Sequence, residues 1–309
     1  TDVRAAKAAE ILTQKNVCKV VLIGNEDEIK AKFPEIDFTG VSFDDPKTSE
    51  HRAEYANTLY ELRKAKGMTE EQALNIVTNN NMFYACVALK RGDVDGVVGG
   101  AVFSSADVSR AAFQVIKAAP GISSVSSCFV MVPPEDFKYK KYPAYIFSDC
   151  AVIPYPTSDQ LSDIVVAAAD SAKKICEMDP KIAMLSFSTK GSANHESVEK
   201  VRVAYQKVRE EHPEIVVDGE LQLDASLVDS VAKQKAPGSP VAGKANVLVF
   251  PNLDAGNIGY KIAQRFGNCM AIGPIMQGLA LPVNDLSRGC VAEDIAAVAA
   301  ITALQSVKD

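Results

Sequence analysis

Short apolar runs alternate with helical patterns along most of the 309-residue chain. The apolar runs are rich in β-branched residues, which favour strands, and they cover residues 19–24, 95–102, 126–132, 144–152, 181–187, 245–250 and 269–275. Helical patterns lie between them, at residues 49–66, 70–91, 105–119, 158–178, 196–211, 225–235 and 257–266. This alternation predicts an α/β protein whose sheets are mostly parallel and are flanked by helices.

Composition and charge exclude several classes of protein. The net charge of −6 and the lack of a Lys/Arg tract argue against binding to nucleic acid or to a membrane surface. No uncharged apolar run is long enough to cross a bilayer, and the N-terminal residues alternate charge with alanine like a surface helix. The seven cysteines form no Cys-x-x-Cys pair and mostly lie in apolar runs, which predicts reduced core residues of a cytoplasmic protein.

Several common cofactor and catalytic motifs are missing. No Gly-x-Gly-x-x-Gly follows a strand, so a nicotinamide cofactor has no support. Gly238–Lys244 resembles a phosphate-binding P-loop, but Ala245 stands where Ser or Thr would bind magnesium. The histidines lie in or beside charged segments and form no evident metal site or Ser-His-Asp system: His51, His195 and His212. We therefore expect neither a metal nor a cofactor.

The segment 282–294 has the features of an anion site. Ser287, Arg288 and Gly289 precede a long, alanine-rich helical pattern whose first turn carries Asp294. Free backbone N–H groups, the positive end of a helix dipole and a forked guanidinium group all favour an anion there. A carboxylate in this position is either a partner of the helix dipole or a base, and the residues alone leave both possibilities open.

Three further places carry polar residues suited to a ligand. Arg110 lies about one and a half turns into a helix that begins at Ser104 and Ser105, so it can reach a ligand at the helix start or be a plain surface arginine. Arg63 ends a helix, where simple charge compensation is the favoured reading. Residues 251–261 follow an apolar strand and read as a loop that brings backbone close to a ligand, or as an ordinary βα turn.

The motifs at 245–261 and 273–289 closely resemble those of the phosphate acetyl/butyryltransferase family, the phosphotransacetylases. The resemblance extends over the whole chain through residues 62–68, 96–100 and 120–127. It implies two α/β domains of the isocitrate/isopropylmalate dehydrogenase type, an active-site cleft between them, and a homodimer. It also implies reversible transfer of an acetyl group between CoA and inorganic phosphate, through a ternary complex, with acetyl phosphate as product and no acetyl-enzyme.

The resemblance gives roles to individual residues. Asp294 matches the general base for the CoA thiol, Ser287 the residue that stabilises the transition state, and Arg288 the residue that holds the phosphate of acetyl phosphate. Leu281 departs from the family, which more often has lysine before this proline. Four further residues are expected to bind CoA or phosphate: Arg63, Arg110, Asn257 and Ser105.

The composition predicts the domain limits, and the resemblance leaves two rival functions. The polar, proline-rich stretch 133–143 suggests a first domain of residues 1–137 plus 290–309 and a second of 138–289. A phosphate butyryltransferase would differ chiefly in the volume of its acyl pocket. A non-catalytic acetyl-CoA-sensing module, like the related region of some malic enzymes, is disfavoured by the intact set of candidate catalytic residues.

Proton transfer from the CoA thiol to Asp294 requires a site that makes it more favourable than it is in water. A free thiol has a pKa near about 8.5 and a free Asp near about 3.9, so proton transfer between them is unfavourable in water. Burial would raise the pKa of Asp294, whereas a helix N-terminus and Arg288 would lower it, so the net shift stays open. We expect Asp294 to act mainly through its position and Ser287 to donate to the carbonyl oxygen. Cys290, next to Arg288, is either a low-pKa thiol or a packing residue.

Overall fold

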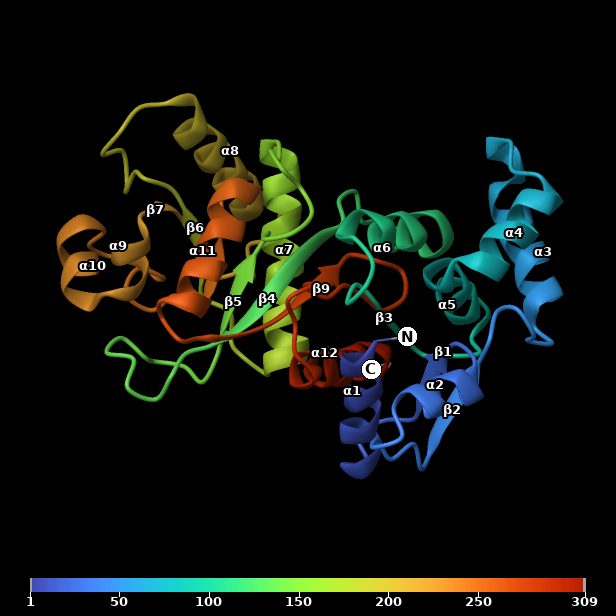
Figure 1. Ribbon diagram of the computed structural model, residues 1–309. Coiled ribbons are helices and arrows are strands. Elements are labelled where there is room, and N and C mark those ends of the chain that lie inside the picture. Colours follow the sequence, from blue (N-terminus) through green and yellow to red (C-terminus); the bar gives the residue numbers. More distant parts are fainter. Residues whose placement is uncertain (1, 308–309) are drawn as a thin grey trace. The chain divides into compact units, whose positions relative to one another are not determined.

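A computed structural model describes residues 2–307 of the chain and divides it into two compact units (Figure 1). Unit 1 is formed by Thr1–Pro120 together with Leu279–Asp309, and unit 2 by Gly121–Gly278. These limits lie N-terminal to those expected from the sequence. The reason is strand pairing: β4 (Ser126–Val132) is hydrogen-bonded within the sheet of unit 2, and β10 (Val283–Asn284) pairs with a strand of unit 1.

Unit 1 is mostly helical and, within the described residues, has two small parallel sheets. One sheet pairs β1 with β2, and the other pairs β3 with β10. The elements of unit 1 besides β10 are α1 (Val3–Gln14), β1 (Val20–Ile23), α2 (Glu26–Lys32), β2 (Val41–Asp44), α3 (Arg52–Arg63), α4 (Glu70–Asn79), α5 (Asn81–Arg91), β3 (Val97–Val98), α6 (Ser105–Ala111) and α12 (Ala292–Ser306). A short 3-10 helix follows α3 at Lys64–Lys66, and a π-helical segment follows α6 at Ala112–Ile116.

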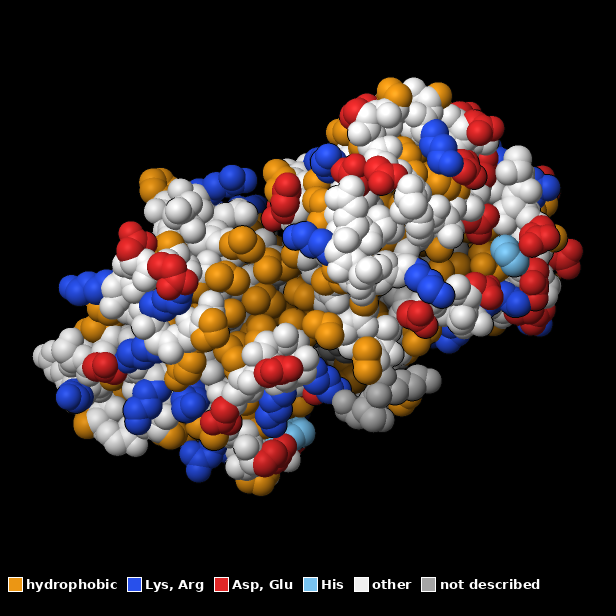
Figure 2. Space-filling view, turned by 90° about the horizontal axis from the view of Figure 1, so that it is seen from below, with side chains coloured by type: hydrophobic (Ala, Val, Ile, Leu, Met, Phe, Trp, Pro, Cys, Tyr) orange, Lys and Arg blue, Asp and Glu red, His pale blue; other side chains and the backbone are white. Residues whose placement is uncertain are grey.

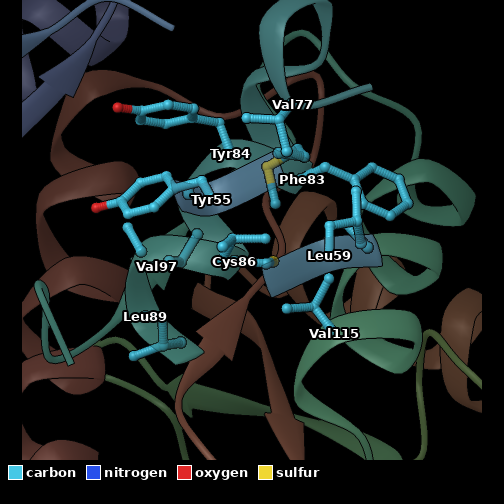
Figure 3. Packing of buried hydrophobic residues seen from close by; sticks show 14 of the residues in the cluster. Tyr55, Leu59, Val77, Phe83, Tyr84, Cys86, Leu89, Val97 and Val115 are labelled. Atoms are coloured by element: carbon cyan, nitrogen blue, oxygen red, sulfur yellow. The ribbon is translucent and has the colours of Figure 1, made fainter. Parts of the chain in front are cut away.

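The core of unit 1 is built around α5, whose side chains from Met82 to Leu89 are all buried (Figure 3). The sequence predicts one helix over 70–91, but the chain breaks between α4 and α5. Asn80 causes the break because its side chain accepts the N–H groups of Met82 and Phe83 and so caps α5. A buried tyrosine, Tyr84, keeps its hydroxyl paired with Asp44 at 2.6 Å.

Unit 2 contains a six-stranded sheet in the order β7-β6-β8-β5-β4-β9. Strand β4 runs antiparallel to both of its neighbours, and the other pairs are parallel, which confirms the predicted mostly parallel α/β architecture. Helices pack around this sheet. The elements besides β4 are β5 (Tyr145–Ser148), α7 (Ser158–Cys176), β6 (Ile182–Leu185), α8 (Glu196–Glu211), β7 (Val217–Leu221), α9 (Leu223–Leu227), α10 (Asp229–Lys235), β8 (Val247–Val249), α11 (Leu253–Arg265) and β9 (Met270–Gln277).

The surface carries both signs of charge. Lys and Arg side chains are interspersed with Asp and Glu on the face drawn in Figure 2, and a group of hydrophobic side chains lies exposed among them. This mixture fits the modest net charge of −6, and the face drawn in Figure 2 has no broad basic field. Over residues 2–307, no helix combines the length and apolar character that crossing a membrane requires.

Candidate active site

Two loops of unit 1 start at the same edge of a sheet. Strands β3 and β10 are parallel, with Val97 opposite Val283 and Val98 opposite Asn284. The carboxyl ends of parallel strands face the same way, which is where α/β proteins commonly place their ligands. The loop after β3 leads to α6, which carries Ser105 and Arg110, and the loop after β10 carries Ser287 and Arg288.

The two loops touch at Gly100, which has a φ angle of +105°. A Cβ atom built there would lie 2.2 Å from Asp285 Oδ1 and 2.5 Å from the backbone nitrogen of Leu286. Only glycine fits such an approach, because any larger residue would overlap both the carboxylate and the backbone. The Gly99-Gly100 pair that ends the strand therefore brings the two loops into direct contact.

Ser287, Arg288 and Gly289 form an exposed turn. The backbone N–H of Cys290 donates to the Ser287 carbonyl oxygen at 2.9 Å, and the N–H of Gly289 donates to Ser287 Oγ at 3.3 Å. Ser287 Oγ is thus an acceptor within the turn, and its proton is not donated to any residue that the structure describes. The hydroxyl is free to donate to a ligand.

Asp294 is the third residue of α12 and is half-buried. Its Oδ2 atom accepts the backbone N–H of Val291 at 3.0 Å, so the carboxylate caps the helix. Oδ1 makes no hydrogen bond with any described residue. The capping role that the sequence allowed is therefore present, and one oxygen stays available for a second role.

Arg4 holds this turn from the other end of the chain. Its Nη1 atom donates to the carbonyl oxygens of Arg288 at 2.7 Å and of Cys290 at 3.0 Å. Its Nη2 atom donates to the carbonyl oxygen of Ala101, in the loop after β3, at 2.9 Å. Asp2 pairs with the same guanidinium group through both carboxylate oxygens, each at 2.9 Å. The N-terminal residues were predicted to be an ordinary surface helix, and the contacts of Arg4 with the two loops were not predicted.

Cys290 is a buried packing residue. Burial raises the pKa of its thiol, and the nearby Arg4 guanidinium only partly opposes that effect. The alternative that Cys290 is a low-pKa thiol is therefore wrong: the cation closest to it in sequence, Arg288, is exposed, and removal from water dominates.

Arg110 and Ser105 lie on α6. Ser104 rather than Ser105 caps this helix, because its hydroxyl oxygen accepts the N–H of Asp107 at 3.2 Å. Ser105 is exposed as the first residue of the helix. Arg110 is exposed and forms an ion pair with Asp107 at 2.8 Å. Exposed pairs of this kind contribute little stability, so the guanidinium group can exchange Asp107 for a ligand anion at small cost.

Arg63 and Asn257 lie in different surroundings. Arg63 is the last residue of α3, and its Nε atom is buried without a hydrogen-bond partner among the described residues. Asn257 lies in unit 2, whereas the other candidates lie in unit 1. Helix α11 begins at Leu253, four residues before the helix predicted at 257–266, so Asn257 falls in its second turn and most of the loop predicted at 251–261 is helical. Its amide donates to the Cys150 carbonyl oxygen at 3.0 Å.

Asp285 is a buried carboxyl group that was not among the residues predicted for the site. Only 2% of the residue is exposed, and its Oδ1 atom lacks a hydrogen-bond partner in the described part of the chain. Burial raises its pKa, and hydrogen bonding by the Ser105 hydroxyl and the Leu286 N–H partly opposes the rise. The available signal in the sequence was the polar Asn284-Asp285 pair that follows the apolar residues 279–283.

Unit 2 has a separate cavity of about 520 Å³ beside β7 and α8, whose charged side chains pair with one another. Glu220 accepts from Arg202 Nε at 3.1 Å and from Ser188 Oγ at 2.8 Å, and Lys190 pairs with Asp218. The charged lining residues Lys190, Arg202 and Glu220 are each engaged in an ion pair, Lys190 with Asp218 behind the lining. Within residues 2–307, no three His, Cys, Asp or Glu side chains group as a metal site would require.

Comparison with known proteins identifies the family. A family model described as "Phosphate acetyl/butaryl transferase" matches residues 1–303. The chain is thus an acyltransferase by class. More narrowly, it belongs to the phosphate acetyl/butyryl transferase family.

Individual relatives agree with this assignment. The chain is 52% identical to a phosphate acetyltransferase from Acetivibrio thermocellus over 306 residues, covering 99% of this chain and 92% of the relative. It is 46% identical to the phosphate acetyltransferase of Bacillus subtilis over 308 residues, with the same coverage. A solved phosphotransacetylase from Streptococcus pyogenes superposes with a TM-score of 0.90 at 42% identity, covering 99% of this chain and 91% of that one. The expected dehydrogenase-like α/β fold is the fold of these structural neighbours.

Proposed function

We propose that the protein catalyses the reversible reaction of acetyl-CoA with inorganic phosphate to give acetyl phosphate and CoA. The observation that carries this proposal is the turn at Ser287 and Arg288, in the loop that leaves the carboxyl end of β10 beside β3, followed by Asp294 at the start of α12. Relatives that are 44–52% identical over nearly the whole chain carry the name phosphate acetyltransferase. The intact catalytic set favours an enzyme over a sensing module.

The residues divide the chemistry of thioester formation. The CoA sulfur attacks the carbonyl carbon of acetyl phosphate while the thiol proton passes to Asp294, whose Oδ1 atom is not used in capping α12. The Ser287 hydroxyl donates to the carbonyl oxygen as negative charge develops there. The bond between carbon and the phosphate oxygen then breaks, and Arg288 holds the departing phosphate by its charge and its forked donors.

This scheme passes through a ternary complex and forms no acetyl-enzyme. Ser287 has no His or Lys hydrogen-bonded to it that would activate it as a nucleophile, as far as the described residues extend. Labelled inorganic phosphate mixed with enzyme and acetyl phosphate should therefore not enter acetyl phosphate when CoA is absent. Exchange without CoA would instead require an acetyl-enzyme.

Arg63, Arg110, Ser105 and Asn257 are proposed to bind CoA or phosphate. The support differs among them. Arg110 and Ser105 are exposed on α6, which follows the loop that touches Asp285 and Leu286, directly before the Ser287 turn. Arg63 has a buried donor that lacks a partner within residues 2–307. Asn257 rests on the family resemblance alone, because its amide already binds the Cys150 carbonyl oxygen.

One assay tests which acyl group the enzyme prefers. Thioester formation would be followed with acetyl phosphate and, separately, butyryl phosphate, each with CoA in buffer freed of metal ions. We expect acetyl phosphate to be the better substrate, by roughly tenfold or more in kcat/KM, since a pocket distinguishes methylene groups by about 1–3 kcal/mol. We also expect activity without added metal or cofactor, because Arg288 meets the phosphate charge. A preference for butyryl phosphate would assign the butyryl activity instead.

We also propose that the protein is a homodimer that contacts its copy through α11. Ile258 and Ile262 are four residues apart on this helix and are 57% and 52% exposed, and Phe266, which follows its last residue, is 91% exposed. Residues at this spacing share one face of a helix. Met270, at the start of the edge strand β9, extends the apolar surface. An apolar stripe of this kind is typical of a protein interface.

Sedimentation tests the dimer. The wild-type chain should sediment at twice 33.1 kDa, and Ile262→Glu should sediment as a monomer because it places a charge in the apolar stripe. Leu74→Glu is a matched control, since Leu74 is also exposed but lies on α4 in unit 1. A wild-type monomer, or a dimer that persists in Ile262→Glu, would remove the α11 interface.

We place the protein in the cytoplasm, where thiols stay reduced. The support is that all seven cysteines are free. Burial raises the pKa of the thiols of Cys86 and Cys128 to about 12, so neither is poised to form a disulfide. Thiol titration of unfolded, freshly purified protein should find seven free thiols.

A further inference from the structure

Arg4 uses its guanidinium group to join three separate segments of the chain. Two donors contact the turn at Arg288 and Cys290, one contacts Ala101 in the loop after β3, and the remaining contacts are to Asp2 beside it. The contact with Arg288 spans 284 positions in the sequence. Outside Asp2, three of the acceptors are backbone carbonyl oxygens and the fourth is Cys290 Sγ at 3.7 Å, so the contact acts mainly on the path of the main chain.

The contacted carbonyl belongs to Arg288 itself, the residue proposed to hold the phosphate. Side-chain hydrogen bonds within the turn run only from Gly289 N–H to Ser287 Oγ, at 3.3 Å, as far as the structure describes. Ser287, Arg288 and Gly289 are exposed, so little packing holds them. The orientation of this turn therefore depends on groups that bind its backbone from outside.

We propose that Arg4, oriented by Asp2, is a positioning residue that sets the place of the Ser287–Arg288 turn relative to the loop after β3. This inference rests on the proposed function, because the turn is taken to carry the oxyanion donor and the phosphate-binding cation. Arg4 does not contact substrate. It acts by holding the backbone from which both catalytic side chains project.

Arginine is suited to this task in a way that lysine is not. Its planar group presents five donors in fixed directions, which match the Asp2 carboxylate on one side and three carbonyl oxygens on the other. A lysine ammonium group in the same place has three donors about a single nitrogen and cannot reach all three segments. Arg4→Lys should therefore keep the charge and lose the positioning.

Limited proteolysis tests whether Arg4 holds the Ser287–Arg288 turn in place (the Arg4 clamp), without reference to activity. Trypsin cleaves after Arg288 only when the turn can leave its place, and the carbonyl that trypsin must attack is the one that Arg4 binds. Arg4→Met should speed cleavage at Arg288–Gly289 by about tenfold or more, releasing a fragment of residues 289–309, because the local opening becomes easier. Lys7→Met is the control: it removes the exposed partner of the buried Glu10 on the same helix, and Lys7 makes no contact with the turn among the described residues.

Kinetics then test the catalytic consequence. Arg4→Met and Arg4→Lys should lower kcat for acetyl-CoA formation by about 10²-fold, because small misplacements of reacting groups have effects of that size. Asp2→Asn should have a smaller effect in the same direction, and Lys7→Met none. Thermal unfolding would confirm that each variant is folded before it is assayed, and Arg4→Lys serves if Arg4→Met does not fold.

The outcomes separate this inference from the proposed function. Unchanged trypsin cleavage at Arg288 in a folded Arg4 variant overturns the clamp, whatever the activity. Faster cleavage with unchanged kcat overturns the positioning role. A wild-type protein that forms no acetyl-CoA overturns the proposed function, and the proteolysis result still decides whether Arg4 holds the turn.

Discussion

The Asp294 carboxylate caps helix α12 and is also proposed to be the general base of the reaction. Oδ2 accepts the N–H of Val291 and caps α12, and this bond fixes the direction in which Oδ1 points. A carboxylate that is held at a helix start is also a well-placed base, because the capping bond limits its rotation. The choice between dipole partner and base that the sequence left open is therefore not exclusive.

Substitutions at this position should separate the two roles. Asp294→Ala removes the cap and should lower the free energy of unfolding by about 1 kcal/mol. Asp294→Asn keeps an oxygen that can accept the Val291 N–H, so its loss should be smaller, about 0.5 kcal/mol or less. Urea unfolding of both variants measures this. Equal losses in Asn and Ala would show that the capping bond contributes nothing.

Glu220 gives the clearest pH-dependent prediction. Burial acts to raise its pKa, but hydrogen bonds from Arg202, Gly191 and Ser188 outweigh it and lower the pKa to about 2. A carboxyl group with a lowered folded-state pKa adds stability above its unfolded value near 4.5, and that stability is lost as the pH falls toward about 2. The stability difference between wild type and Glu220→Gln should therefore shrink between pH 5 and pH 2.

Unfolding at several pH values would measure this difference. Glu210→Gln is the control, because Glu210 is exposed on α8 and, in the described part of the chain, forms no ion pair. Its difference from wild type should stay nearly constant. A Glu220→Gln difference that is the same at pH 7 and pH 2.5 would contradict the proposed network.

At the level of elements, the contact between the β3 and β10 loops depends on one glycine. Gly100→Ala would place a methyl group 2.2 Å from Asp285 Oδ1 at a φ of +105°. We expect a loss of about 3 kcal/mol or more, from overlap and backbone strain together. Gly67→Ala has a similar φ of +85° but meets nothing within 4 Å, so it should lose only about 1 kcal/mol. Comparable losses in the two variants would mean that the loop contact is not tight.

Elements with strong periodicity were predictable from the sequence, and others were not. Strand β4 and helix α8 have the residues that the pattern predicts, Ser126–Val132 and Glu196–Glu211. Strand β7 was not predicted because its sequence, Val-Asp-Gly-Glu-Leu, contains two acidic residues and a glycine, although all five residues are buried. Its Asp and Glu are tolerated because Lys190 and Arg202 pair with them, which is a tertiary effect.

At the scale of the whole molecule, the chain returns to unit 1 after completing unit 2. Unit 1 therefore takes residues from both ends of the sequence, and its site combines segments near positions 4, 100 and 288. The motif that contains Ser287 and Asp294 could be recognised in the sequence because its residues lie within one short segment. Arg4 was not visible, because its role exists only once segments 284 positions apart have come together.

Acetyl-CoA formation by wild type and Asp294→Asn is the measurement that tests the central claim most directly. Both proteins would be assayed with acetyl phosphate and CoA, after unfolding curves have shown that the variant is folded. The wild type should form acetyl-CoA rapidly, and Asp294→Asn should lose about 10²–10⁴-fold in kcat, the usual contribution of a general base. Wild-type activity that survives unchanged in Asp294→Asn would contradict the assignment of the base. A wild type that forms no acetyl-CoA would contradict the function itself.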